Sequence, residues 1–177
     1  MRIIAVMIGS DSDLPQCQTG LEYLAKMAEE GRVKVVEVIT ASIHRNTEFV
    51  LEKLRSLVGK VDALIVGAGW ANALTGITDA FLRNTLRDDR IVVVGVAFED
   101  NHGPNFTQTA ILSIVHTPGT QVVFTDLLSS LDRFIGKNGF SLACQSAVEG
   151  ELPVITLKDP KPPITRTLEE TLKAAQG

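Results

Sequence analysis

The sequence predicts an α/β fold: a three-layer sandwich with a doubly wound parallel sheet of the flavodoxin-like or Rossmann-like kind, and an extra C-terminal helix. Two observations predict this fold class. Short runs rich in valine and isoleucine alternate with longer stretches whose apolar residues recur at helical spacing. Most of the short runs are apolar throughout, as in strands that are buried on both faces. Alternating buried strands and helices are typical of right-handed crossovers in a parallel sheet.

Five segments are predicted to form strands, namely residues 3–8, 33–39, 63–66, 91–96 and 121–124. The second segment alternates between apolar and polar residues more than the others do. The first apolar run leads directly into Gly9 and polar residues and has no small-residue cleavage site. It is therefore predicted to be a strand and not an export signal.

Three helices are predicted between the strands, because apolar residues recur there every three or four positions. The defining positions are Leu14, Cys17, Leu21, Leu24 and Ala28; Phe49 or Val50, Leu54 and Leu57; and Ile77, Phe81, Leu82 and Leu86. The helical pattern returns at residues 127–135, breaks at Gly136 and Gly139, and resumes at residues 140–148. A proline-rich stretch at residues 160–163 separates a final amphipathic helix, near residues 165–175, from the body.

The length of 177 residues, 45% of them apolar, is enough for one domain with its own core. We expect residues 1–159 to form this single α/β domain and residues 160–177 to form a tether and a helix. The helix can pack on its own domain or dock on a neighbouring subunit.

Composition argues against several classes of function. The net charge is −4 and the 17 Lys and Arg are scattered, so a nucleic-acid partner is not expected. No apolar run reaches the ~18 residues of a membrane span, so no membrane association is expected. Cys17 and Cys144 are too few for a disulfide scaffold and occupy apolar helical positions. We expect two reduced core thiols in a cytoplasmic protein.

Polar residues follow the first two strands, at the edge of the sheet where ligands bind in open parallel folds. Residues 9–15 read Gly-Ser-Asp-Ser-Asp-Leu-Pro, and Asp13 and Pro15 suit the start of a helix. Such a start can hold a phosphate, and the aspartates can accept hydrogen bonds from sugar hydroxyls; a capped turn without a ligand is the alternative. The glycine pattern of a dinucleotide site is absent, and no further lysine or carboxylate supports magnesium-dependent phosphate transfer.

Residues 41–45 follow the second strand and offer a phosphate site beside an acid/base group. Ser42 and Arg45 can bind a phosphate, and His44 can donate or accept a proton near neutral pH. A solvated surface histidine is the alternative. We favour function because this strand end lies beside the first in such a sheet.

Residues 67–76, Gly-Ala-Gly-Trp-Ala-Asn-Ala-Leu-Thr-Gly, follow the third strand. Small residues allow a ligand to approach the backbone, so a small dry pocket is predicted. Tight helix packing is the alternative, with Trp70 as a lid or an interface residue. Beyond the fourth strand, His102 and His116 lack partners at metal-ligand spacing, so we expect no metal site.

Four blocks in order resemble the phosphoribosylaminoimidazole carboxylase catalytic-subunit family (PurE) of purine biosynthesis. They are residues 9–15, Ser-Ile-His-Arg at 42–45, Gly-Ala-Gly at 67–69, and Leu-Ser-Ile-Val at 112–115 with Pro118-Gly119. The resemblance implies carboxylation of aminoimidazole ribonucleotide, from carbon dioxide or by mutase transfer of an N-carboxylate. It also implies that no cofactor is needed and that the enzyme is a homo-octamer with active sites between subunits.

The same resemblance implies roles for individual residues. His44 would be the catalytic acid/base, and the substrate would be bound by Ser10, Asp11, Asp13, Ser42, Arg45, Gly69, Asn72, Ala73 and Leu74. The chemistry suits an imidazole, because the enamine-like ring carbon can attack carbon dioxide unaided and must then lose a proton.

The third block combines features of two forms of the family. The mutase form carries G-G-A-A-H-L-P-G, whereas Ala73 and Thr75 stand here at the histidine and proline positions. Residues 72–76, with Asp79, look more like the N-A-L-S-G form that carboxylates directly, while Asp11, Arg45 and the block at residues 112–115 match the mutase form. The subclass stays open. A catalytically silent or substrate-shifted nucleotide-binding relative is the alternative, and a flavodoxin-like signalling or electron-transfer domain is disfavoured.

Overall fold

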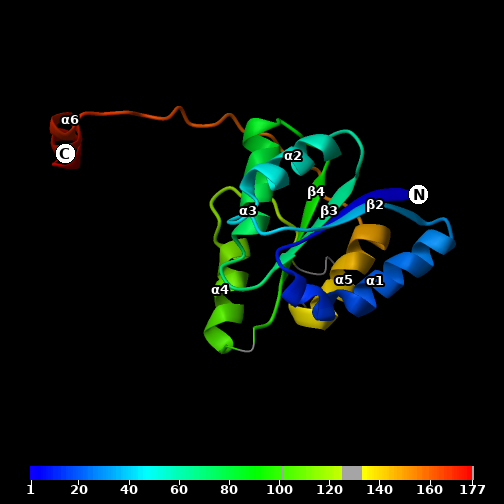
Figure 1. Cartoon of the computed structure of the whole chain (residues 1–177). Coiled ribbons are helices and arrows are strands. Elements are labelled where there is room, and N and C mark those ends of the chain that lie inside the picture. The colour runs from blue at the N-terminus through cyan, green and yellow to red at the C-terminus, as the bar shows by residue number, and fades with distance from the viewer. Residues whose placement is uncertain (101, 125–132, 177) are drawn as a thin grey trace.

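The computed structural model describes residues 1–100, 102–124 and 133–176 and contains a parallel sheet between two helical layers (Figure 1). The strand order is β2-β1-β3-β4, and every neighbouring pair is parallel. The strands are β1 (Arg2–Ile8), β2 (Val33–Thr40), β3 (Ala63–Ala68) and β4 (Val92–Ala97). The predicted three-layer fold class is therefore confirmed.

Two apolar clusters, one on each face of the sheet, form the core. Along β1, Ile4, Val6 and Ile8 belong to one cluster, and Ala5 and Met7 belong to the other. This alternation follows from the period of two in a strand. The first cluster is completed by α1 (Leu14–Glu29), α5 (Gly136–Glu149) and part of α4 (Pro104–Val115), and the second by α2 (Thr47–Leu57) and α3 (Ala73–Ala80).

The close contact between α1 and α5 contains both cysteines. Cys17 and Cys144 are fully buried free thiols, as the apolar spacing predicted. At Gly20 a β-carbon would overlap the ring of Phe140, so a larger residue would push the two helices apart. Burial raises the pKa of the Cys17 thiol to about 12, which keeps it protonated at neutral pH.

The predicted fifth strand is reduced to a bridge. Within residues 121–124, Val123 forms a parallel bridge with Val94 and exchanges backbone hydrogen bonds with Gly95 and Val93 on β4. The N–H of Gln121 instead donates to the Asp79 carboxylate at 3.1 Å. At Gln121, a hydrogen bond to a side chain thus replaces the backbone hydrogen bond that a strand residue would make to its neighbour in the sheet.

The glycine break before α5 was predicted wrongly. Gly136 begins α5 and Gly139 lies within it. Gly139 packs so closely on the backbone of Phe134 that a β-carbon would collide with it, which explains a glycine inside a helix. Most of the predicted helix at residues 127–135 lies outside the described residues; at its end, Ile135 is extended and bridges to Ala97.

Two further helices lie toward the C-terminal half of the chain. Helix α4, which the hydrophobic spacing did not predict, begins at Pro104. Helix α6 (Leu168–Ala175) confirms the predicted terminal helix, and Figure 1 shows it at the far end of an extended segment, apart from the other helices. No helix in the described part of the chain is long and apolar enough to cross a membrane.

Candidate functional site

The loops after β1, β2 and β3 meet at one edge of the sheet. Because the strands are parallel and β1 lies between β2 and β3, Ile8 pairs with both Thr40 and Gly67. Backbone hydrogen bonds extend this contact into the loops: the Gly9 N–H donates to Gly67 at 2.9 Å, and the Ala41 N–H donates to Ile8 at 2.9 Å. The polar residues of the three loops are therefore neighbours, as the topology predicted.

The first loop folds into a short 3-10 turn, η1 (Asp11–Asp13), ahead of α1. Ser10 caps this turn: its hydroxyl oxygen accepts from the Ser12 N–H at 3.3 Å. Asp11 is exposed. Asp13 is the N-cap residue of α1, as predicted, although its side chain makes no capping hydrogen bond. The Asp13 carboxylate lies against Gly69 in the third loop, where a β-carbon added to Gly69 would be 3.8 Å from Oδ1.

This long-range contact leaves Asp13 partly buried. Burial raises the pKa of the Asp13 carboxyl to about 6; the Gly69 N–H opposes this rise, and the nearby negative charge of Asp100 adds to it. Asp13 is thus mostly ionised at neutral pH, yet it can take up a proton under mildly acidic conditions. Perturbed carboxyls of this kind are common at ligand sites.

The second loop is a tight turn in which the backbone N–H groups of Arg45 and Asn46 donate to the Ser42 carbonyl. Ser42 is half-buried, whereas His44 and Arg45 are exposed. Among the described residues, neither the imidazole nor the guanidinium has a hydrogen-bond or ion-pair partner. Both side chains can therefore turn toward a ligand without first breaking a contact in the fold.

The third loop separates residues that face outward from residues that support the fold. Gly69 and Ala73 are half-buried, but Asn72 is 3% exposed and Leu74 is 2% exposed. The Asn72 amide donates to the Val96 carbonyl at 3.0 Å, and its oxygen accepts from the Thr75 hydroxyl at 2.7 Å. Asn72 and Leu74 could thus contact a substrate only through their backbone.

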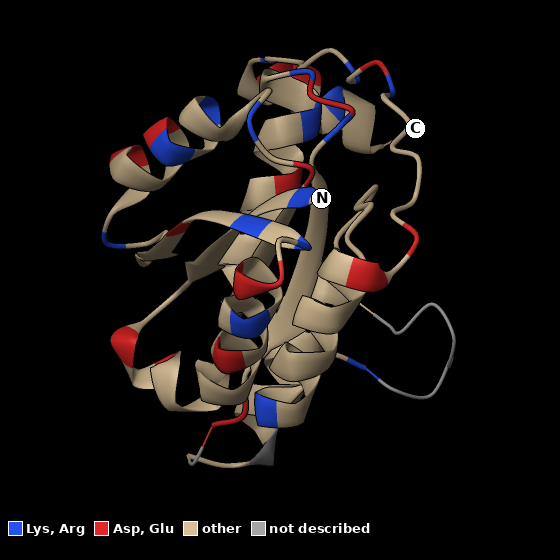
Figure 2. Cartoon of the chain, turned by 90° about the vertical axis from the view of Figure 1, so that its right-hand side faces the viewer, with Lys and Arg blue, Asp and Glu red and all other residues tan. Residues whose placement is uncertain are grey.

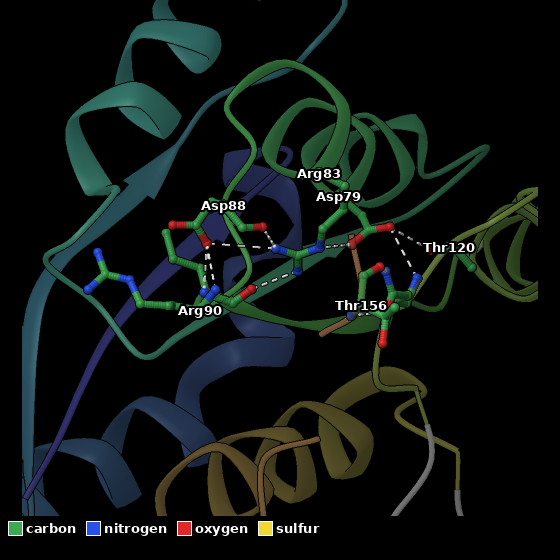
Figure 3. A network of polar contacts seen from close by, with 8 residues as sticks. Asp79, Arg83, Asp88, Arg90, Thr120 and Thr156 are labelled. Carbon is green, nitrogen blue, oxygen red and sulfur yellow. Dashed lines mark hydrogen bonds and ion pairs between the residues drawn. The ribbon is translucent and has the colours of Figure 1, made fainter. Parts of the chain in front are cut away.

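A buried polar network holds α3 in place behind this loop (Figure 3). Arg83 lies in a π-helical turn, η2 (Phe81–Thr85), that continues α3. Its Nε donates to Asp79 at 3.1 Å, and its terminal nitrogens donate to the carbonyls of Asp88 at 2.9 Å and Ile91 at 2.6 Å. The other Asp79 oxygen accepts from the Gln121 N–H, so the network joins α3, the start of β4 and the segment after α4.

Sequence reasoning missed the residues that the loop after β4 adds to this edge. The Asp100 carboxylate accepts from the His102 backbone N–H at 2.7 Å and lies 2.5 Å from its Nδ1. The hydrogen bonds from His102, its backbone N–H foremost, lower the pKa of the Asp100 carboxyl, and the nearby Trp70 side chain adds a smaller effect in the same direction. Pro104, a residue favoured in the first turn of a helix, was the sequence signal that α4 begins here.

The side chain of Gln16 fastens this fourth loop to α1. Its amide nitrogen donates to the Glu99 carbonyl at 2.9 Å, and its oxygen accepts from the Glu99 N–H at the same distance.

Over residues 1–100, 102–124 and 133–176, no three His, Cys, Asp or Glu side chains cluster closely enough to hold a metal ion. The edge therefore offers hydroxyls, carboxylates, the imidazoles of His44 and His102, and the guanidinium of Arg45 for binding a ligand. Elsewhere, acidic and basic residues are interspersed along the helices (Figure 2).

Comparison with known proteins gives a consistent result. The model of the AIR carboxylase family matches residues 3–146. No curated protein sequence matches the chain. Similar solved structures include a single-substitution variant of Treponema denticola PurE2, with 21% identity, 70% of each chain covered and a TM-score of 0.51. Treponema denticola PurE has 20% identity over 68% of this chain and 69% of that chain, with a TM-score of 0.49.

Proposed function

The chain belongs to the AIR carboxylase family, and from this premise we propose that it carboxylates aminoimidazole ribonucleotide in purine biosynthesis, with His44 as the acid/base. The observation that supports the proposal best is the convergence of the three loops at the carboxyl edge of the sheet. There the Ser-Asp-Ser-Asp turn lies beside the turn that carries His44 and Arg45.

Binding of the ribonucleotide is divided between the first two loops. Arg45 and Ser42 take the phosphate, because a guanidinium forms paired charge-assisted hydrogen bonds to phosphate oxygens. Asp11 and Asp13 accept hydrogen bonds from the ribose hydroxyls, and the Ser10 hydroxyl can donate to them or accept from them. Gly69 and Ala73, with the backbone of Asn72 and Leu74, line the ring side, where small residues leave room for a carboxyl group.

The proton step belongs to His44. As the ring carbon bonds to the carbon of carbon dioxide, the new carboxylate takes the negative charge, and the ring carbon still carries its proton. The neutral imidazole accepts that proton, and the ring electrons return to the aromatic system. Because His44 is exposed, the imidazolium can release the proton to water.

The test is His44→Asn, assayed with aminoimidazole ribonucleotide and bicarbonate and, separately, with the N-carboxylated ribonucleotide. We expect turnover to fall roughly 10²- to 10⁴-fold, as for the loss of a general acid/base, with ligand affinity nearly unchanged. Consumption of aminoimidazole ribonucleotide with bicarbonate by the parent enzyme would indicate a carboxylase, and consumption of the N-carboxylated ribonucleotide would indicate a mutase. Turnover of the variant within a few-fold of the parent would overturn the role of His44.

The second candidate is a relative that binds the ribonucleotide without turnover or acts on a shifted substrate. It is motivated by Ala73, which replaces the histidine of the mutase form, and by the bulky Trp70 in the same loop. This second candidate would be favoured if the parent protein binds the ribonucleotide but consumes neither bicarbonate nor the N-carboxylated ribonucleotide.

A further inference from the structure

Three aromatic side chains form a continuous surface at the edge of the candidate site, which we term the aromatic wall: Trp70, His102 and Phe106. The ring centroids of Trp70 and Phe106 are 5.0 Å apart, and His102 lies 5.9 Å from each of the other two. The rings are tilted or edge-on, the arrangement that aromatic quadrupoles prefer. Trp70 comes from the loop after β3, and the other two come from the segment after β4.

The backbone of Trp70 is held in an unfavourable conformation. Its φ is +53°, and only Asn72 and Arg87 share a positive φ among the non-glycine residues of the described chain. A bulky side chain disfavours this left-handed region, and such outliers persist where the surrounding structure fixes them, often at functional sites. Here the ring contacts with His102 and Phe106 hold the indole in place.

The fold nevertheless leaves the indole largely uncovered. Trp70 is 56% exposed, the highest value of any aromatic residue among the exposed apolar side chains of the described chain. A tryptophan that contributed only to stability would gain most from burial. Its position instead presents an aromatic surface to whatever occupies the site.

The wall adjoins the residues assigned to the ribonucleotide. Gly69, directly before Trp70, lies against the Asp13 carboxylate: a β-carbon added to Gly69 would be 3.8 Å from Oδ1. Asp100, which lies near the Trp70 side chain, is also close enough to Asp13 to raise the pKa of that carboxyl. Trp70 is thus connected to Asp13 on two sides, through the backbone of its own loop and through Asp100.

We propose that Trp70 is a specificity-determining residue: the planar ring of the ribonucleotide packs on the aromatic wall, so the site prefers a ring-bearing ligand to a ribose phosphate without a ring. The identity of the ring rests on the proposed function. Stacking on an aromatic side chain recognises any flat heterocycle, and the indole presents the largest such surface of the three.

The experiment compares two ligands by calorimetry, aminoimidazole ribonucleotide and ribose 5-phosphate, with the parent, Trp70→Leu and Trp70→Phe. Leucine should weaken the ribonucleotide roughly 5- to 10-fold, the lower end of base stacking for a five-membered ring, and leave ribose 5-phosphate unchanged. Phenylalanine, which keeps a ring, should restore most of the preference. Arg45→Ala is the contrast, because it should weaken both ligands.

A second signal comes from the parent protein. Trp70 is its one tryptophan, so its fluorescence should change with the ribonucleotide and much less with ribose 5-phosphate. Equal losses for both ligands in Trp70→Leu, or no loss for either, would overturn the inference, as would a parent that binds neither ligand. A parent that binds the ribonucleotide through Trp70 but turns over neither carboxyl donor would support the inference while the proposed reaction fails.

Discussion

Asp13, which the proposed function assigns to the ribose, carries a carboxylate whose ionisation lowers the stability of the fold. It lies between the Gly69 N–H and the negative charge of Asp100, and burial raises its pKa from 3.8 to about 6. Between pH 4 and 6 the folded chain therefore holds this proton more tightly than the unfolded chain does. The free energy of unfolding falls as the pH rises through that window, and the loss is complete above pH 6.

Asp13→Asn should consequently make the protein more stable at pH 7, by about 1–3 kcal/mol, since two pKa units correspond to at most about 3 kcal/mol. Asparagine has the same shape as aspartate, so its amide oxygen can occupy the same place beside Gly69. Urea unfolding from pH 3.5 to 8 should show the difference shrinking to nothing below pH 4. Asp11→Asn, on the exposed side of the same turn, should not change stability. A variant less stable than the parent at pH 7 would refute this account.

The sequence allowed candidate site residues to be selected, but it did not predict which residues they contact in the fold. Ser10, His44 and Arg45 could be selected because they follow strands, where the topology brings loop residues together. The partners of Asp13 could not, because Gly69 is 56 positions away and its backbone N–H carries no side-chain signature. Asp100 and His102 were missed for the same reason, since only the folded chain brings them to Trp70.

At the scale of elements, α3 is held by buried charges in addition to apolar packing. Asp79 and Arg83 have side chains only 3% and 5% exposed, and Asp88 has a side chain 2% exposed. The π-helical turn lets Arg83 reach Asp79 and the carbonyls of Asp88 and Ile91 together. An unpaired charge in such a place is costly, whereas the complete set is well satisfied.

Arg83→Met should therefore destabilise the fold by about 3–5 kcal/mol, because it leaves two carboxylates buried without their cation. Asp79→Asn should be milder, since the amide oxygen can accept from Gln121 or Arg83. In a double-mutant cycle, the variant with both substitutions should lose less free energy of unfolding than the sum of the losses in the two single variants. Glu169→Gln, which removes an exposed ion pair on α6, is the control and should change stability by under about 0.5 kcal/mol. An Arg83→Met loss below about 1 kcal/mol would show that the network does not support α3.

Elements with continuous apolar runs could be predicted from sequence, and elements that depend on side-chain contacts could not. The four strands and α1 follow from hydrophobic periodicity alone. The fifth strand was overpredicted because nothing local shows that Asp79 will bind the Gln121 N–H. Gly139 suggested a helix break, although its small size is what lets α5 approach Phe134.

At the scale of the whole molecule, helix α6 does not pack against the rest of the described chain. Thr167 and Glu170 form a capping box at the start of α6, so the helix is well defined locally. Yet Leu168 is 77% exposed and Leu172 is 55% exposed, and no described residue of α6 is buried. Among the described residues, a single copy of the chain thus provides no surface on which α6 packs. This favours the predicted alternative in which its leucines pack on a neighbouring subunit.

If α6 docks on a neighbour in the octamer that the family resemblance implies, Leu168→Ser combined with Leu172→Ser should weaken assembly while each subunit keeps its fold, because both leucines are exposed in a single copy. A chain ending after Asp159 should behave likewise. Light scattering over a range of protein concentrations measures the mass, and circular dichroism checks the fold. Lys173→Ser, on the same helix, is the matched control and should leave assembly intact. An unchanged mass and an unchanged melting temperature for the truncated chain would show that α6 has no role in assembly or in stability.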